Sequence, residues 1–158
     1  MKLYIREKVF GWDDSFNVLD ENGNRVFKCR GEAGVLGNSF EVTRERKTVA
    51  EIHEKLIKLR PKYTVEIGKE EFEVIKKAIG IGNNFVVKGL DWDISGDIIN
   101  HKYEIKKGRE TIAKISRRMV AAIDSYELNI EDARNALEVV CCAIAVDAIV
   151  SEEKKEKK

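Results

Sequence analysis

The sequence predicts a mainly β protein, in which a closed antiparallel barrel of about twelve strands surrounds a hydrophobic C-terminal helix. Three observations support this fold class. Apolar and polar residues alternate through most of residues 2–130, turn residues interrupt that pattern at short intervals, and residues 131–150 form one long apolar stretch. A chain of 158 residues with 43% hydrophobic residues is large enough for a single domain with a sizeable core.

Strands with one buried and one solvated face account for the alternation. In the segment 63–67 the apolar residues Tyr63, Val65 and Ile67 enclose Thr64 and Glu66, as expected for a half-buried antiparallel strand. The same reading along the chain predicts strands at 2–8, 14–20, 25–31, 38–44, 48–56, 62–67, 70–79, 84–90, 92–97, 101–107, 110–118 and 124–130. Residues 70–79 have helical propensity as well, and we assign them to a strand.

Turn residues separate these strands. The sequence Glu-Asn-Gly-Asn at 21–24 is a strong hairpin signal, and Gly68-Lys69 and Gly108-Arg109 are weaker ones. Glycines at positions 80 and 82, followed by two asparagines, predict a loop at 80–84. Short connections of this kind favour antiparallel neighbours throughout.

The segment 131–150 predicts a helix, because it lacks Gly and Pro, opens with two acids and is followed by lysines. Asn129 is the expected N-cap, with Asp132 reaching back as in a capping box. The remaining residues, 151–158, carry mixed charges and predict a frayed tail. The domain is therefore expected to span residues 1–150.

Apolar residues cover every side of this helix, so it must be buried on every side. Glu138 and Asp147 limit the longest uncharged stretch of the helix to residues 139–146. A bilayer span needs about 20 apolar residues. The helix is therefore expected to fill the inside of the barrel. We place Glu138 and Asp147 near the two mouths, hydrogen-bonded or solvated, with a general base in an open cavity as the alternative for Asp147.

Charge and cysteine content exclude several classes of protein. The 29 basic and 28 acidic side chains give a net charge of +1, so any polyanion must be recognised by a local patch. The N-terminus has no apolar signal segment, and no membrane-spanning segment is expected, which favours the cytoplasm. Cys29, Cys141 and Cys142 are expected to be reduced core residues.

Basic residues between positions 44 and 62 form the best candidate for an anion-binding or lipid-binding site. The residues assigned to it are Arg44, Arg46, Lys47, Lys58, Arg60 and Lys62. In an extended strand the last three would share one face, where they could hold phosphate oxygens. The alternative is a solvated strand face. The chain lacks the basic excess and interleaved aromatics of nucleic-acid-binding proteins, so a nucleic acid partner is not expected.

Catalytic and metal-binding motifs are absent from the sequence. It contains no G-x-S-x-G or P-loop, and no third glycine follows Gly80 and Gly82. His53 and His101 lack the spacing of a zinc site, and no EF-hand loop is present. We therefore predict no catalytic residues, no cofactor, no metal and no enzymatic activity.

Several segments together resemble a known family. They are residues 4–10, 16–23, 55–63, 89–92, 96–97, 112–116 and 124–126, followed by the apolar helix. In this order they resemble the LURP-one-related family, which is related to tubby C-terminal domains and phospholipid scramblases. The resemblance implies a twelve-stranded, tubby-like barrel around a central hydrophobic helix. Members of the family are largely uncharacterised, and the tubby and scramblase relatives imply phosphoinositide or phospholipid ligands.

These inferences lead to one leading function and two alternatives. We expect a non-enzymatic binding or scaffolding domain that recognises anionic phospholipid or phosphoinositide headgroups, located in the cytoplasm with peripheral contact to membranes. The first alternative is a protein-interaction module without a lipid ligand. A scramblase-like or nucleic-acid-binding protein is the less favoured second alternative. Nothing in the sequence specifies the oligomeric state.

Overall fold

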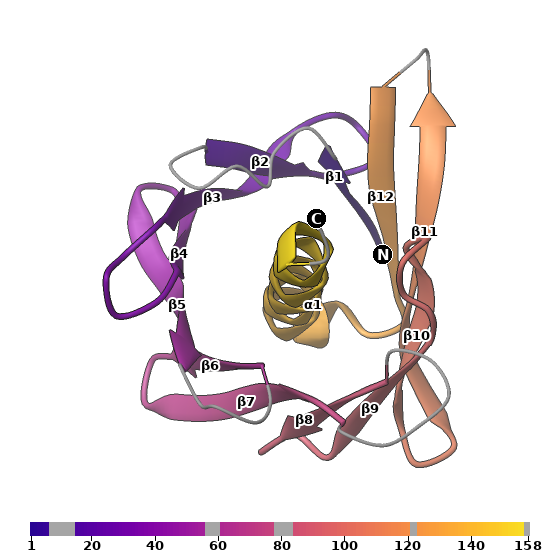
Figure 1. Cartoon of the computed structure of the whole chain (residues 1–158). Coiled ribbons are helices and arrows are strands. Elements are labelled where there is room, and N and C mark those ends of the chain that lie inside the picture. The colour runs from indigo at the N-terminus through magenta and orange to yellow at the C-terminus, as the bar shows by residue number, and fades with distance from the viewer. Residues whose placement is uncertain (7–14, 56–60, 78–83, 121–122, 157–158) are drawn as a thin grey trace.

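Twelve strands form a closed barrel around one long helix (Figure 1). The structure, a computed structural model, describes residues 1–6, 15–55, 61–77, 84–120 and 123–156. The elements are β1 (Lys2–Arg6), β2 (Ser15–Leu19), β3 (Arg25–Glu32), β4 (Ser39–Arg44), β5 (Lys47–Lys55), β6 (Lys62–Ile67), β7 (Glu70–Lys76), β8 (Phe85–Lys88), β9 (Trp92–Asp97), β10 (Lys102–Lys107), β11 (Glu110–Val120), β12 (Ile123–Ile130), a 3-10 turn η1 (Ala133–Asn135) and α1 (Ala136–Glu156).

Every strand pairs antiparallel with its neighbours in the chain, and β1 pairs with β12 to close the ring. The closing register runs from Lys2 opposite Asn129 to Arg6 opposite Ser125. The N-terminal ammonium of Met1 also donates to the carbonyl of Ile130, over 3.1 Å. Closure leaves none of the twelve described strands at an open sheet edge, as expected for a β-rich chain with a single proline.

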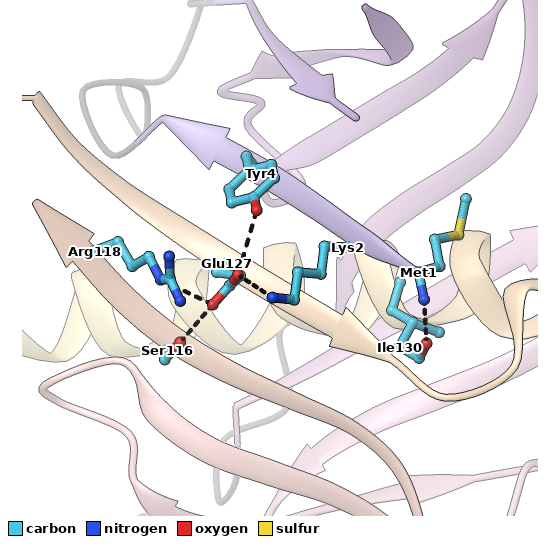
Figure 2. Close-up of polar contacts among 7 residues, drawn as sticks. All are labelled: Met1, Lys2, Tyr4, Ser116, Arg118, Glu127 and Ile130. Carbon is cyan, nitrogen blue, oxygen red and sulfur yellow. Dashed lines mark hydrogen bonds and ion pairs between the residues drawn. The ribbon is translucent and has the colours of Figure 1, made fainter. Parts of the chain in front are cut away.

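A buried carboxylate on the outer wall strengthens the closure (Figure 2). Glu127 of β12 accepts hydrogen bonds from the Tyr4 hydroxyl at 3.3 Å and from the Ser116 hydroxyl at 3.5 Å. Its carboxylate also lies 3.0 Å from Nε of Arg118 and 3.5 Å from Nζ of Lys2. The Glu127 side chain is only 7% exposed, although it points outward as the alternation of β12 predicts. Tyr4 and Lys2 thus join the first strand to the last, and Ser116 and Arg118 join the last strand to β11.

The connections alternate between two rims of the barrel. The first rim holds the β4–β5 turn at residues 45–46, the β10–β11 turn and the start of α1. The second rim holds the β3–β4 loop at residues 33–38, the β9–β10 turn and the end of α1. Because all pairs are antiparallel, successive turns must lie at opposite rims. Residues close in sequence can therefore lie a full strand length apart.

The interior is filled by α1, which Figure 1 shows threaded through the ring of strands. Every residue from Val139 to Val150 is at most 5% exposed, and inward side chains of the strands pack around them. The prediction of a helix buried on all sides is confirmed. Within the described ranges, no helix combines the length and the apolar character needed to cross a membrane.

The helix boundaries differ from the prediction. The amide of Glu131 donates to the carbonyl of Ile112 at 3.0 Å, so the chain still pairs with β11 at the predicted first helical residue. Asn129 lies within β12 and is not the cap. Asp132 instead accepts from the Arg134 amide and caps η1.

The tail is also more ordered than predicted. Residues 151–156 continue α1, so they are helical where we expected fraying. Side-chain contacts at the second rim explain the difference. Glu152 accepts from the side-chain amide of Asn38, and Glu153 pairs with Lys76. Interactions of this kind link the end of α1 to β7 and to the β3–β4 loop.

The twelve predicted strands are all present, with shifts of a few residues at their ends. Residues 70–76 form β7, so the strand assignment is confirmed over the helical propensity of that segment. The strand β8 is shorter than predicted, and β11 extends two residues further. The predicted ends of the first strand, at residues 7–8, and most of the loop at 80–84 lie outside the described residues.

Candidate anion-binding groove

A groove with a cavity volume of about 590 Å³ lies on the outer face of β3 and β4 and extends to the β4–β5 turn. Five cationic side chains line it, and we call it the basic groove. They are Arg25, Lys28, Arg30, Arg44 and Arg46. Two acidic residues, Glu41 and Glu45, also line it, so cations are in excess.

Strand alternation places the cations of β3 on this face. Phe27 and Cys29 are completely buried and point into the barrel, which turns Lys28 and Arg30 outward. In the β3–β4 register, Lys28 lies opposite Thr43. The same residues that form the core therefore determine the direction of the cations.

The β4–β5 turn supplies the other end of the groove. Glu45 and Arg46 both have left-handed backbone angles, with φ of 49° and 69°. Two left-handed residues are typical of a type I′ hairpin turn, in which Asn and Gly are normally preferred. Arg44 precedes this turn, and its guanidinium carbon lies 4.6 Å from the centre of the Phe27 ring. This cation–π contact holds the Arg44 guanidinium at the first rim, against a ring that points into the barrel.

The cations of the basic groove are available to an external anion. Among the described residues, none of the five forms an ion pair with a carboxylate, and all five residues are exposed. Glu41 instead accepts a hydrogen bond from the Thr48 hydroxyl at 3.0 Å. Arginine forks and a lysine ammonium can share the oxygens of one phosphate, carboxylate or sulfate group. The groove is therefore suited chemically to an anionic ligand.

The structure describes four of the six residues that the sequence assigned to one site, and it separates them. Arg44 and Arg46 line the basic groove. Lys47 begins β5 directly after the turn and is not among the described residues that line the groove. Lys62 begins β6 at the second rim, where it pairs with Glu73. Lys58 and Arg60 lie outside the described residues.

The distance between Arg46 and Lys62 follows from the length of β5, which lies between them in the chain. Its nine residues, Lys47–Lys55, span about 25 Å at ~3.3 Å per residue. Lys62 lies opposite Lys55 at the far end, so it cannot bind the same small anion as Arg46. The two parts of the predicted site are distinct surfaces.

Sequence reasoning missed Arg25, Lys28 and Arg30. A signal was present, because Lys28 and Arg30 alternate with Cys29 inside a correctly predicted strand. The pairing of β3 with β4 was needed to bring them to Arg44. The β3–β4 register is therefore as important for assembling the groove as the number of basic residues in these segments.

A second groove, of about 690 Å³, lies on the outer face of β9–β12. Its cations Lys102 and Lys114 are balanced by Asp97, Glu104 and Glu127. Nζ of Lys114 lies 3.6 Å from Glu104. Since its charges neutralise one another, this groove is less suited to an anion.

Asp147 lies inside the barrel in a chain of polar contacts. It is 5% exposed, and its Oδ1 lies 3.3 Å from Nδ1 of His101. Nε2 of His101 lies 3.2 Å from the hydroxyl of Tyr126, and the two rings stack with centroids 4.2 Å apart. Asp147 therefore contacts His101 and is buried rather than solvated. Asp147 lines neither of the two grooves described above.

The three cysteine thiols are unreactive because they are buried inside the barrel. Cys29, Cys141 and Cys142 are free and buried, which confirms the prediction of reduced core residues. Burial raises the pKa of Cys29 to about 12, and burial raises the pKa values of Cys141 and Cys142 as well. The three thiols therefore stay protonated near neutral pH.

Comparisons with known proteins agree with this architecture. The family model described as LURP-one-related matches residues 1–147. The chain is 30% identical over 158 residues to a Bacillus subtilis (strain 168) protein named "Uncharacterized protein YxjI", covering 99% of this chain and 98% of that one. An X-ray structure of an Arabidopsis thaliana protein is similar in fold, with a TM-score of 0.61 and 15% identity, covering 92% of this chain and 90% of the other. With the closed barrel, the central helix and the match over nearly its whole length, the chain belongs to the LURP-one-related family.

Proposed function

We propose that this protein is a non-enzymatic binding module that recognises phosphate-bearing anions, presented as anionic phospholipid or phosphoinositide headgroups, in the basic groove. The observation that carries the proposal is the convergence of five cations from three segments on one open groove. Arg44 and Arg46 belong to the set expected from the sequence, and Arg25, Lys28 and Arg30 complete it.

The location of the groove supports a ligand attached to a surface. The groove lies on the outer wall and at the first rim, so a headgroup can reach it without entering the barrel. Each Lys or Arg near an anionic leaflet contributes about 1 kcal/mol to binding, and the effect falls off within a Debye length. A local excess of cations is required here because the whole chain has a net charge of only +1.

The filled interior supports a non-enzymatic role. Twelve consecutive residues of α1, from Val139 to Val150, are buried against the strands. Small-molecule enzymes of barrel type need an enclosed pocket for substrate, and α1 occupies the place where such a pocket would lie. The buried contact between Asp147 and His101 holds α1 to the β9–β10 turn and gives these residues a structural role.

Vesicle co-sedimentation tests the proposal. We expect wild-type protein to bind vesicles containing phosphatidylserine or a phosphoinositide, and not vesicles of phosphatidylcholine alone. The variant Lys28→Glu/Arg30→Glu should lose at least about tenfold in affinity, since each removed cation contributes about 1 kcal/mol. A parallel binding measurement with free inositol phosphates would show whether the groove also binds a soluble anion or binds only a headgroup held in a membrane.

The matched control is Lys102→Glu/Lys114→Glu, which makes the same change of charge on the balanced groove of β9–β12. This variant should retain most of the binding. Equal loss in the two double variants would show attraction by overall charge alone and would contradict the proposed site. Equal binding by wild type and Lys28→Glu/Arg30→Glu would contradict it as well.

A second function, protein interaction, is favoured by the tip of the β3–β4 loop. Val35 is 100% exposed and Leu36 is 88% exposed, side by side between Gly34 and Gly37. The amide of Gly37 donates to the carbonyl of Gly34 at 3.2 Å, which closes a tight turn. The tip lies at the second rim, opposite the turn that carries Arg46. The variant Val35→Ser/Leu36→Ser should therefore leave vesicle binding unchanged if the two functions are separate; loss of vesicle binding would show that the tip itself contacts lipid.

A further inference from the structure

Four glutamates form a row across the outer wall next to the basic groove. Glu41 of β4 lies opposite Glu51 of β5, Glu51 lies opposite Glu66 of β6, and Glu66 lies opposite Glu71 of β7. We call these four residues the acidic row. Directly facing like charges on neighbouring strands destabilise a sheet. Unlike charges would be expected at such positions if they served stability alone.

A histidine adds a nitrogen donor beside this row. His53 follows Glu51 by two positions on β5 and therefore shares its outward face. Nε2 of His53 lies 3.7 Å from a carboxylate oxygen of Glu51. One donor atom from each of Glu51, His53 and Glu66 lies within 4.8 Å of the others, and all three side chains are exposed.

Neither Glu51 nor Glu66, the two carboxylates of this trio, forms an ion pair with a lysine or arginine in the part of the chain that the structure describes. This contrasts with Lys62 and Glu73, which pair across the neighbouring strands β6 and β7. Glu51 and Glu66 therefore combine convergent geometry with uncompensated charge.

We propose that Glu51, His53 and Glu66 bind a divalent transition-metal ion of the Zn²⁺ class. An imidazole nitrogen with two carboxylate oxygens suits zinc, copper or nickel, whereas Mg²⁺ and Ca²⁺ prefer oxygen ligands alone. Donors bound to one zinc ion at ~2.1 Å lie ~3.4 Å apart, so small rotations of these exposed side chains close the site. The paired backbones of β5 and β6 hold the three Cα positions in place.

The surroundings leave room for a further ligand on the ion. A groove of about 300 Å³ is lined by Arg30, Glu41, Glu51 and His53, among other residues. A metal site with three protein ligands keeps an open position for water or an anion. Arg30 also lines the basic groove, so the two sites are neighbours on the wall.

Zinc titration by calorimetry on the full chain tests this proposal. We expect one saturable Zn²⁺ site in the wild type, and no saturable binding of Mg²⁺ or Ca²⁺. Glu66→Gln and His53→Ala should each weaken zinc binding by about tenfold or more, because loss of even an outer-shell partner costs 10–100-fold. Glu71→Gln is the matched control, since it removes the same charge from the acidic row outside the trio, and it should change the affinity by less than about threefold.

Three outcomes would overturn the proposal. The first is the absence of saturable zinc binding in the wild type, and the second is equal binding in the wild type, His53→Ala and Glu66→Gln. The third is an equal loss in Glu66→Gln and Glu71→Gln, which would indicate diffuse attraction to the acidic row.

NMR of the imidazoles gives a readout independent of affinity. The chain has two histidines, and His101 is 8% exposed inside the barrel. Zinc should shift the ring signals of His53 and leave those of His101 in place; a shift of His101 alone would contradict the site. Glu66 lines neither the basic groove nor its neighbour, so a failure here is distinguishable from a failure of the proposed vesicle binding.

Discussion

The inside and the outer wall of this barrel follow opposite rules. Inside, the apolar side chains of α1 and of the strands are buried together, and the buried carboxylate of Asp147 contacts His101. Outside, between β3 and β7, charged side chains of like sign lie next to one another, first the cations of the basic groove and then the glutamates of the acidic row. The difference teaches that the interior supplies most of the buried contacts, whereas the wall carries the charged surfaces on which we propose binding.

The largest expected effect is the low reactivity of the buried cysteine thiols compared with free cysteine. Burial raises the pKa of Cys29 from an ordinary 9.0 to about 12, which lowers its thiolate fraction near pH 8 by about a thousandfold. A disulfide reagent should therefore label none of the three cysteines in the folded protein on the time scale of free cysteine. Rapid labelling without denaturant would show that the interior opens readily and would break the contrast.

Truncation of the central helix should have the largest effect on stability. Ile144 is completely buried at the middle of α1. We expect Ile144→Ala to lower the free energy of unfolding by 2–5 kcal/mol, about the cost of a methyl-lined cavity in a core. Urea denaturation followed by tryptophan fluorescence measures this. A loss below about 1 kcal/mol would mean that α1 packs loosely.

The Glu127 carboxylate sharpens the comparison, because it lies on the wall yet is buried. Glu127→Gln keeps the shape and weakens the contacts with Arg118 and Lys2, so we expect a loss of about 1–3 kcal/mol in unfolding free energy. The control is Glu104→Gln, a partly exposed carboxylate near Lys106 and Lys114, with an expected loss of about 0.5 kcal/mol or less. Equal losses in the two variants would show that Glu127 does not stabilise the closure of the barrel.

The smallest effect is expected at the β4–β5 turn, and it has the opposite sign. Left-handed backbone at Glu45 and Arg46 suits Asn and Gly better. Glu45→Asn/Arg46→Gly should raise the free energy of unfolding by about 0.5–1 kcal/mol and weaken binding to anionic vesicles. Stabilisation with unchanged vesicle binding would show that Arg46 does not contact the ligand.

The sequence predicted the fold well because its signals are local. Alternation within short segments, together with turn residues between them, identified all twelve strands, and a helix apolar on every side has one place in a closed barrel. The helix ends were less predictable. They depend on contacts between distant segments, such as Glu131 with Ile112 and Glu152 with Asn38.

The candidate site was predictable only in part, for the same reason. Arg44 and Arg46 are close in sequence and remain close in the turn. Lys62 looked equally suitable, but β5 carries the chain to the other rim before β6 begins, and Glu73 of β7 neutralises it. Lys28 and Arg30 join Arg44 only through the pairing of β3 with β4.

Chemical-shift mapping tests the central claim, that this barrel binds through its wall while its interior stays closed. Titrating the labelled protein with a soluble inositol phosphate should shift the amide signals of Lys28, Arg30, Arg44 and Arg46, and leave those of Val140 and Ile144 unchanged. Shifts centred on α1, or no shift at the basic groove at millimolar ligand, would contradict the account.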